Sequence, residues 1–302
     1  MGQILACDLG SNSLRVLLWD CDTFTRIKEY EKILNLAKDL RTNQMIDKKS
    51  IEGIIEALKE SGFDFLNTPT IAIATEALRR ARNKTLVVGL IKSKIGINFR
   101  IIDEKEEAFL SRLGAEFLLQ NKDLDTNSYF LVDLGGGSME LTCKNGSNLY
   151  SRSFPLGVIT LLANNPKREL FKRALTKGLE SLKLSINSWP KPAKLILTGG
   201  TATTLSAYLH GLNYKNYDYK VVSGSNLSLK DATKALKEAT LMSKDEKESL
   251  AGPKRGALVI AGIKILIETM ETLGFDKAII VDEGVREGAA IAYCGFLANK
   301  EA

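Results

Sequence analysis

Apolar and polar positions along the chain predict a strand–turn–strand unit that occurs twice. Residues 3–8 and 14–20 are apolar or alternate with polar residues, as paired strands do, and a glycine-containing segment separates them. The same pattern returns at 132–140, where an apolar run leads into a second glycine-rich turn. Each half of the chain is therefore expected to open with a β-hairpin.

Strands and helices alternate through the rest of the sequence, and Ser50 is placed to cap a helix that continues to about Ser61. Further strands are expected at 29–36, 70–74, 98–102, 149–154, 194–198 and 278–281. Further helices are expected at 84–95, 104–120, 166–188, 229–240, 256–273 and 287–302, with another that opens near 200. This alternation predicts an α/β fold.

The segment 211–229 is irregular and rich in tyrosine. Tyr214, Tyr217 and Tyr219 are expected in a loop or an edge hairpin. A stacking platform for a nucleobase is the alternative interpretation of these aromatic residues.

The length favours two domains, because 302 residues exceed what a single hydrophobic core usually supports. The polar segment 121–128 is the predicted boundary. We therefore expect a first domain over 1–124 and a second over 125–286. The closing helix 287–302 is expected to fold back onto the first domain.

The two turns share the pattern Asp-Leu-Gly-x-x-Ser, beginning at Asp8 and at Asp133. A glycine-rich turn can direct successive backbone N–H groups at an anion, and its aspartate can organise a cation or a water molecule. A plain hairpin would explain one such turn, but the matched repeat favours a phosphate site. Two such turns are expected to clamp a polyphosphate in a cleft.

Composition narrows the classes of partner. The chain has 42 Lys+Arg and 36 Asp+Glu, and this modest excess of +6 is compatible with an anionic substrate. No stretch of 18 apolar residues or signal-peptide pattern is present, so no membrane partner is expected. A nucleic-acid partner is not expected either. Cys7, Cys21, Cys143 and Cys294 form no Cys-x-x-Cys motif and are expected to be reduced thiols in a cytoplasmic protein.

The single histidine, His210, restricts the chemistry that the chain can perform. Sites that use pairs of imidazoles for acid–base work or for metal binding need more than one. Proton transfer is therefore expected to use carboxylates, and His210 is interpreted as a surface residue at the end of a helix.

Several motifs together resemble those of the exopolyphosphatase/guanosine pentaphosphate phosphohydrolase family. They occur in the family's order along nearly the whole chain: 8–13, 75–83, 106–108, 133–140, 199–204 and 284–288. The two hairpins are shared with actin-like ATPases and sugar kinases, whereas the 75–83 and 106–108 motifs are more particular to the phosphohydrolases. The resemblance implies two actin-like (ribonuclease H-like) domains with a central cleft.

The resemblance assigns the catalytic carboxylates. Glu107 matches the family's water-activating base, while Asp8, Asp133 and Glu140 resemble the carboxylates that hold Mg²⁺ or steer the water. Two plainer interpretations remain open. Glu107 could be an exposed glutamate in the first turn of a helix, and Glu140 a strand residue that faces solvent.

The resemblance also assigns groups that bind phosphate. Arg15 and Arg79 are candidate clamps with a forked geometry, and Arg79 is counted with Glu107 and Asp133 as catalytic. Arg80 and Arg82 are expected on the solvated face. The remaining candidate substrate-binding residues are Ser11, Asn12, Ser13, Gly136, Gly137, Ser138, Gly200, Thr201 and Arg255, the last of which could equally be a surface arginine.

The chain departs from the family at three positions where an arginine is usual. Asn35, Phe109 and Ile159 stand there instead. These changes leave the expected fold and base in place, but they put the preference for polyanion length in doubt. The helical domain that follows in longer members is not expected either, which favours pppGpp or short polyphosphate.

The sequence thus predicts a cytoplasmic, Mg²⁺-assisted phosphoanhydride hydrolase. Its expected reaction removes the terminal phosphate of inorganic polyphosphate, or converts guanosine pentaphosphate (pppGpp) to the tetraphosphate (ppGpp). The rivals are a sensor that binds an alarmone or polyphosphate without turnover and an actin-like kinase. A homodimer is compatible with the family resemblance. The sequence itself does not indicate the oligomeric state.

Overall fold

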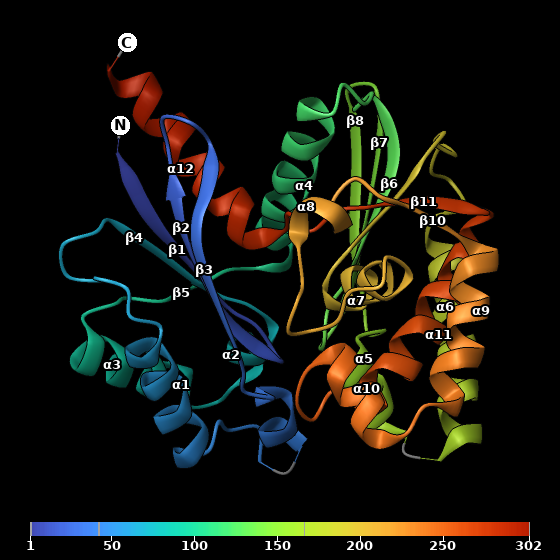
Figure 1. The fold of residues 1–302 in the computed structure, drawn as a ribbon, viewed down its shortest axis with the longest axis horizontal. Helices are drawn as coiled ribbons and strands as arrows, with labels where there is room; N and C mark the ends of the chain where they lie inside the picture. The colour runs from blue at the N-terminus through green and yellow to red at the C-terminus, as the bar shows by residue number, and fades with distance from the viewer. Residues whose placement is uncertain (1, 42, 166, 302) are drawn as a thin grey trace. The chain divides into compact units, whose positions relative to one another are not determined.

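Two hairpins of alternating apolar strands each begin a separate sheet, and the chain accordingly forms two α/β units (Figure 1). The computed structural model describes residues 2–41, 43–165 and 167–301. These ranges exclude Pro166, where one predicted helix begins. They also exclude Met1 and Ala302, the terminal residues of the predicted first domain.

The first unit comprises Met1–Gly114 and Val285–Ala302. Its sheet has the order β3-β2-β1-β4-β5, in which β1 runs antiparallel to β2 and parallel to β4. The strands are β1 (Gln3–Leu9), β2 (Ser13–Asp20), β3 (Thr25–Ile33), β4 (Thr70–Ala74) and β5 (Arg100–Ile101). The helices are η1 (Leu36–Arg41), α1 (Lys48–Glu60), α2 (Glu76–Arg80), α3 (Lys84–Ile95), the first part of α4 (Glu104–Asn121), and α12 (Val285–Glu301).

Opposite faces of this sheet pack against different helices. Leu5, Cys7 and Leu9 of β1 belong to one core cluster with apolar residues of α1 and α3. On the other face, Ile73 of β4 packs with apolar residues of α4 and α12. Because successive strand residues face opposite ways, Asp8 lies on the face that α4 and α12 cover.

The second unit comprises Ala115–Gly284, and its sheet has the order β10-β11-β9-β6-β7-β8. The strands are β6 (Ser128–Leu134), β7 (Met139–Asn145), β8 (Asn148–Phe154), β9 (Leu195–Thr198), β10 (Asn226–Ser228) and β11 (Lys277–Ile280). The helices are α5 (Val158–Asn164), α6 (Arg168–Ser185), α7 (Gly200–Leu209), α8 (Tyr219–Val222), α9 (Leu229–Leu241), α10 (Lys244–Ala251) and α11 (Gly256–Leu273). The apolar helix α11 contacts α5, α6, α7, α9 and α10 and forms the centre of their layer.

The expected repeat is present in the topology. In each unit an antiparallel hairpin is followed by a parallel strand on its inner side, β4 beside β1 and β9 beside β6. The α/β class and the two hairpins are therefore confirmed. The helices α5, α8 and α10 were not expected, because each is short and its apolar period is weak.

Local chemistry shifts some predicted boundaries. The first long helix begins at Lys48, and its cap is Asp47, whose side chain accepts a hydrogen bond from the Ser50 amide at 2.6 Å. The predicted cap, Ser50, is therefore a helical residue. In the tyrosine-rich segment, Tyr214 and Tyr217 lie in a loop, whereas Tyr219 begins α8, and the edge strand β10 lies near the end of the segment.

The division between the units falls inside α4, at Gly114 and Ala115, rather than in the polar segment 121–128. The physical reason is that the two parts of this helix bury their apolar residues against different sheets. Leu110 packs with residues of β4 and α12, whereas Leu118 and Leu119 pack with residues of β6, β9 and β11.

The helix α12 is fixed to the first unit by close packing and by buried charges. A Cβ atom at Gly288 would overlap the backbone of Leu110 in α4. Arg286 is buried and bonds to the carboxylates of Glu287 at 2.6 Å and Glu29 at 3.1 Å. Burial opposes the charge on Arg286, but these carboxylates raise its pKa above the usual value.

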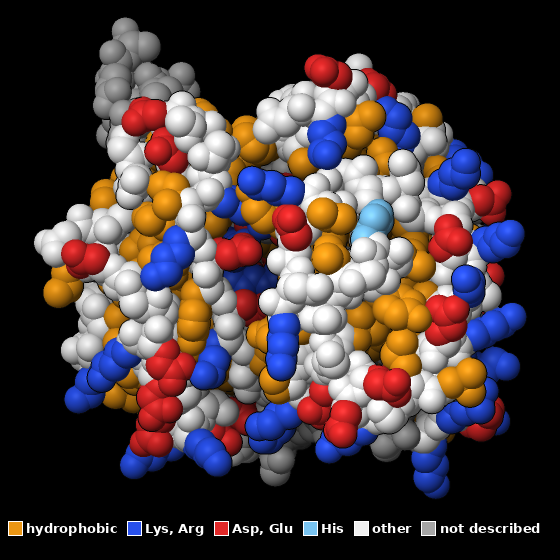
Figure 2. Space-filling model, viewed as in Figure 1, with side chains coloured by type: hydrophobic (Ala, Val, Ile, Leu, Met, Phe, Trp, Pro, Cys, Tyr) orange, Lys and Arg blue, Asp and Glu red, His pale blue; other side chains and the backbone are white. Residues whose placement is uncertain are grey.

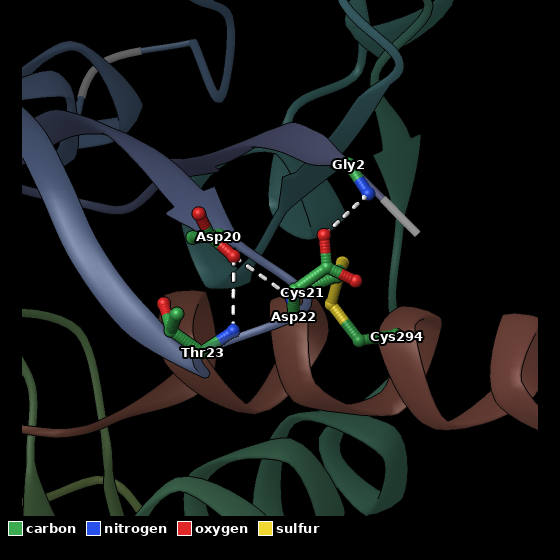
Figure 3. Close-up of a disulfide and its surroundings, with 6 residues drawn as sticks. All are labelled: Gly2, Asp20, Cys21, Asp22, Thr23 and Cys294. Carbon is green, nitrogen blue, oxygen red and sulfur yellow. Dashed lines mark hydrogen bonds between the residues drawn. A yellow bond between two sulfur atoms is a disulfide. The ribbon is translucent and has the colours of Figure 1, made fainter.

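A disulfide joins Cys21, just after β2, to Cys294 in α12 (Figure 3). This corrects the expectation of four reduced thiols, because residues far apart in sequence are brought together by the packing of α12. Cys7 and Cys143 are free and buried. Burial raises the pKa of Cys7 well above its usual range and that of Cys143 to about 11, so both are protonated at neutral pH.

In the described part of the chain no helix is both long and apolar enough to cross a bilayer. On the face shown in Figure 2, basic and acidic side chains are interspersed over much of the surface. His210 caps the end of α7 and is exposed, as expected.

We predict that Gly288→Ala destabilises the protein, because the added methyl group meets the Leu110 backbone, which cannot rotate away. Overpacking of this kind costs on the order of 2 kcal/mol of unfolding free energy. Gly295→Ala is the matched control, since it changes the same helix at a position with open space around it. The control should gain up to about 1 kcal/mol from helix propensity. Urea unfolding of both variants would contradict the packing if their midpoints moved together.

We predict that reduction of Cys21–Cys294 lowers the melting temperature. The bond closes a sequence separation of 273 residues, and loss of such a constraint costs about 2–5 kcal/mol. A Cys21→Ser/Cys294→Ser variant should melt near the reduced protein and be insensitive to dithiothreitol. Thiol titration of the denatured, unreduced chain should detect the two free cysteines alone. Detection of all four thiols would show that the bond does not form.

Candidate functional site

The first hairpin places two predicted site residues directly opposite each other. Asp8 of β1 pairs in register with Arg15 of β2, so both side chains project from the same face of the sheet. Arg15 is opposite Glu31 of β3 on its other side, and its Nε atom lies 3.4 Å from the Glu31 Oε1 atom. Asp8, Arg15 and Glu31 thus form a row across three strands in which negative and positive side chains alternate.

The turn between these strands is held by the segment that follows β3. The Gly10 amide donates to the Ser13 carbonyl at 2.9 Å, and the Asn12 carbonyl accepts from the amides of Leu34 and Asn35, each at 2.8 Å. Asn35 has a φ of 58°, a left-handed conformation that asparagine tolerates better than most residues. Asn35 therefore shapes this turn, at a position where the family often has arginine.

Two side chains of the first turn have different surroundings. The Ser11 hydroxyl donates to Glu76 Oε2 at 2.8 Å, and Arg80 bonds to the other oxygen of Glu76 at 2.9 Å. The Asn12 Oδ1 atom is buried and has no hydrogen-bond partner among the described residues. An amide oxygen of this kind is a ligand type that hard cations accept. The Ser11 hydroxyl, in contrast, is already used within the protein.

Glu107 and Arg79 are brought together in the first unit. Arg79 lies at the end of α2, and its Nη1 atom donates to Glu107 Oε2 at 2.8 Å and to the Ile102 carbonyl at 2.9 Å. Glu107 lies in the first turn of α4, yet its side chain is only 12% exposed. The interpretation of Glu107 as an exposed, solvated glutamate is therefore wrong.

The second hairpin repeats this arrangement with a different pair of residues. Asp133 of β6 is directly opposite Glu140 of β7, so both carboxylates project from one face. Thr198 of β9 and Ser153 of β8 continue the row on either side. Glu140 is 4% exposed, so it does not face solvent. Its Oε1 atom accepts hydrogen bonds from Ser138 at 2.6 Å and Ser153 at 2.9 Å.

The second turn is closed by the start of α5. The Gly135 amide donates to the Ser138 carbonyl at 3.0 Å, and the Gly136 carbonyl accepts from the Ile159 amide at 2.8 Å. A Cβ atom at Gly157 would overlap Gly137, so only glycine allows this approach. Ile159 is buried in the core, which explains an apolar residue where the family often has arginine.

The predicted contribution of Gly200 and Thr201 comes from the N-terminus of α7. Gly199, just before this end, has a φ of 92° and lies close to β6. A Cβ atom at Gly199 would lie only 2.6 Å from the Leu134 carbonyl oxygen. The Thr201 side chain packs against Gly262 of α11. The backbone at this helix start is therefore better placed to bind an anion than the Thr201 hydroxyl.

The remaining predicted residues lie on separate elements. Arg255 is partly buried at the N-terminal end of α11. Ser13 is buried at the start of β2, where its carbonyl closes the first turn. The assigned roles of these and the other site residues stay predictions.

Polar residues after β11 were not among the predicted site residues. Glu283 is buried and accepts a hydrogen bond from Ser223, while Tyr217 donates to Asp282 Oδ1 at 2.8 Å. Like Asp133 and Thr198, these carboxylates come where a parallel strand ends. The pair Asp282-Glu283 follows a buried strand, and this pattern in the sequence could have identified both residues as site candidates. Glu76 and Ser153 were overlooked as well, because nothing local in the sequence reveals their partners.

The expected Mg²⁺ requires oxygen ligands that lie close together. Within the described residues, no group of three or more His, Cys, Asp and Glu side chains is arranged to hold a metal ion. The Asp133–Glu140 pair nevertheless offers two carboxylates, which is the number that many magnesium sites take from the protein.

Comparison with known proteins agrees with this geometry. A bifunctional 3-dehydroquinate synthase/phosphatase of Fusobacterium nucleatum is 25% identical over 94% of this chain, which spans only 45% of that relative. Exopolyphosphatase 2 of Mycobacterium tuberculosis is 24% identical, with 97% of this chain and 99% of the relative covered.

The crystal structure of the Aquifex aeolicus member of the Ppx/GppA family has the same architecture. It superposes with a TM-score of 0.79 at 25% identity and covers 98% of both chains. The expected fold of two actin-like domains is thereby confirmed. The sequence profile of the Ppx/GppA phosphatase family matches residues 19–293, so the chain belongs to this family.

Proposed function

We propose that this protein is a phosphoanhydride hydrolase that releases the terminal phosphate of inorganic polyphosphate or of pppGpp. Membership of a phosphatase family supports hydrolysis of a phosphate group. The observation that carries the finer assignment is the largely buried Arg79–Glu107 pair. It provides a carboxylate base and a guanidinium in contact, the two kinds of group that attack by water on a phosphoryl group requires.

Glu107 would accept the proton of the attacking water. Its Oε2 atom is held by Arg79, so the carboxylate has a fixed direction. The Nη2 atom of Arg79 is buried and has no hydrogen-bond partner within the described ranges. This atom is a donor suited to an oxygen of the phosphoryl group, where negative charge develops during transfer.

The glycine-rich turns would bind the other phosphates. The backbone N–H groups at Ser11 and Asn12, at Gly136 and Gly137, and at the start of α7 are the proposed donors. Arg15, beside Asp8, adds a cationic group in the first unit. Asp133 and Glu140 would hold Mg²⁺, with Asp8 as the corresponding carboxylate of the first unit. When bound, the ion would offset negative charge on the phosphate oxygens.

The substrate preference we propose is for short polyphosphate or pppGpp over long polyphosphate. Asn35 shapes a turn and Ile159 lies in the core, so neither position supplies a cation. Phe109 is 46% exposed, with the Arg112 guanidinium 5.3 Å from its ring centroid. With fewer cationic groups, a long polyanion gains less electrostatic attraction. The exopolyphosphatase name of the Mycobacterium tuberculosis relative supports polyphosphate as one substrate.

A sensor that binds without turnover is the second candidate function. The observation that favours it is that Asn35, Phe109 and Ile159 supply no cation at positions where the family often has arginine, so less positive charge is available to offset the transition state of hydrolysis. The actin-like kinase is disfavoured, because the family to which the chain belongs is one of phosphatases. The cytoplasm remains the proposed compartment, but the disulfide removes the argument from reduced cysteines.

We predict that Glu107→Gln reduces phosphate release from polyphosphate and pppGpp by about 10²–10⁴-fold, since the amide keeps the shape but cannot accept a proton. Glu106→Gln is the matched control. It changes the adjacent residue, which is more exposed and pairs with Arg100 at 2.5 Å. Inorganic phosphate is measured with Mg²⁺ present. Equal rates for the two variants would exclude Glu107 as the base, and binding without turnover in the unmutated protein would favour the sensor.

We predict that Arg79→Ala destabilises the protein by roughly 2–3 kcal/mol, because it removes the guanidinium partner of a largely buried carboxylate. The control is Arg80→Ala on the same helix. The Arg80 side chain is 46% exposed, so loss of its pair with Glu76 should cost less than about 1 kcal/mol. Urea unfolding curves give both values. A smaller loss for Arg79→Ala than for Arg80→Ala would contradict a structural role of the Arg79–Glu107 pair.

A further inference from the structure

The hydroxyl of Ser153 contacts a carboxylate to which the proposed chemistry assigns a role. Ser153 lies in β8, in register with Glu140 of β7, and both side chains project from the same face. The Ser153 Oγ atom donates to Glu140 Oε1 at 2.9 Å. Ser138 donates to the same oxygen at 2.6 Å. One carboxylate oxygen is thus held from two elements, the turn before β7 and the neighbouring strand.

This arrangement restricts the orientation of Glu140. A buried carboxylate loses hydration, and hydrogen bonds to its charged form offset that loss. Because both hydroxyls bond to Oε1, they also fix how the carboxylate plane is turned about its last torsion. Asp133 is directly opposite Glu140 on the other side. The direction of the Glu140 carboxylate relative to Asp133 is therefore set by these two serines.

A second serine of β8 shows what an ordinary cross-strand hydroxyl looks like. Ser151 is two residues before Ser153, so it projects from the same face, and its partner is the neutral hydroxyl of Thr142 at 3.1 Å. The corresponding outer strand of the first unit is β3, where Glu31 pairs with Arg15. In both units, the outer strand thus supports the charged residue of the middle strand.

We propose that Ser153 is a positioning residue for the hydrolytic reaction. It holds the Glu140 carboxylate in the orientation in which it binds Mg²⁺ together with Asp133. This inference rests on the proposed function of Glu140. It adds a residue outside both glycine-rich turns to the groups on which turnover depends. Partners of metal-binding carboxylates commonly change metal affinity or activity by 10–100-fold when they are removed.

The test compares Ser153→Ala, Ser153→Thr and Ser151→Ala in the full chain. Ser153→Ala should lower kcat for phosphate release about tenfold or more and weaken Mg²⁺ binding by a similar factor in calorimetric titration. The KM at saturating Mg²⁺ should stay within about twofold, because Ser153 contacts Glu140 rather than the phosphates. Ser153→Thr keeps the hydroxyl and should recover most of both losses. Ser151→Ala should match the unmutated protein.

Two results would overturn the inference. One is a Ser153→Ala protein whose kcat and Mg²⁺ affinity equal those of Ser151→Ala. The other is a Ser153→Thr protein as impaired as Ser153→Ala, which would show that shape rather than the hydroxyl matters. If the unmutated protein releases no phosphate from either substrate, the proposed function fails, and Mg²⁺ titration alone decides the role of Ser153. Absence of measurable Mg²⁺ binding in the unmutated protein would then overturn the inference as well.

Discussion

The register of two antiparallel hairpins is the constraint on which the candidate site depends. In β1–β2 it sets Asp8 opposite Arg15, and in β6–β7 it sets Asp133 opposite Glu140. A slip of one residue would turn each set of side chains to the other face of its sheet. Such a slip would also expose the apolar residues that alternate with them. Burial of the core therefore enforces the position of the charged residues.

The helices α4 and α12 extend this constraint to residues outside the hairpins. The α4 helix carries Glu107 in its first turn and packs its apolar residues on the same face of the first sheet from which Asp8 projects. The α12 helix meets α4 at Gly288 and is joined to the end of β2 by the disulfide. Glu107 and the first turn are thus held by a common set of packed elements within the first unit.

Each charged group buried in these elements has partners in the structure, which is the condition for burying it at tolerable cost. Arg79 holds Glu107, two serine hydroxyls hold Glu140, and Arg286 is held by Glu287 and Glu29. Such contacts fix direction as well as charge. A reaction that moves a phosphoryl group depends on groups that are oriented before the substrate arrives, so this rigidity serves the proposed chemistry.

The sequence alone determined the elements whose signals are local. The repeated turns, the strand 70–74 and the helix 84–95 were predicted within their observed bounds, because alternation and helical period are properties of neighbouring residues. The contact of Glu107 with Arg79, the two serines on Glu140, and the bond from Cys21 to Cys294 were decided by tertiary structure. These partners come from different strands and helices, so their distances depend on how the chain folds back on itself. The division inside α4 has the same cause, since a continuous helical pattern does not reveal that its two parts pack on different sheets.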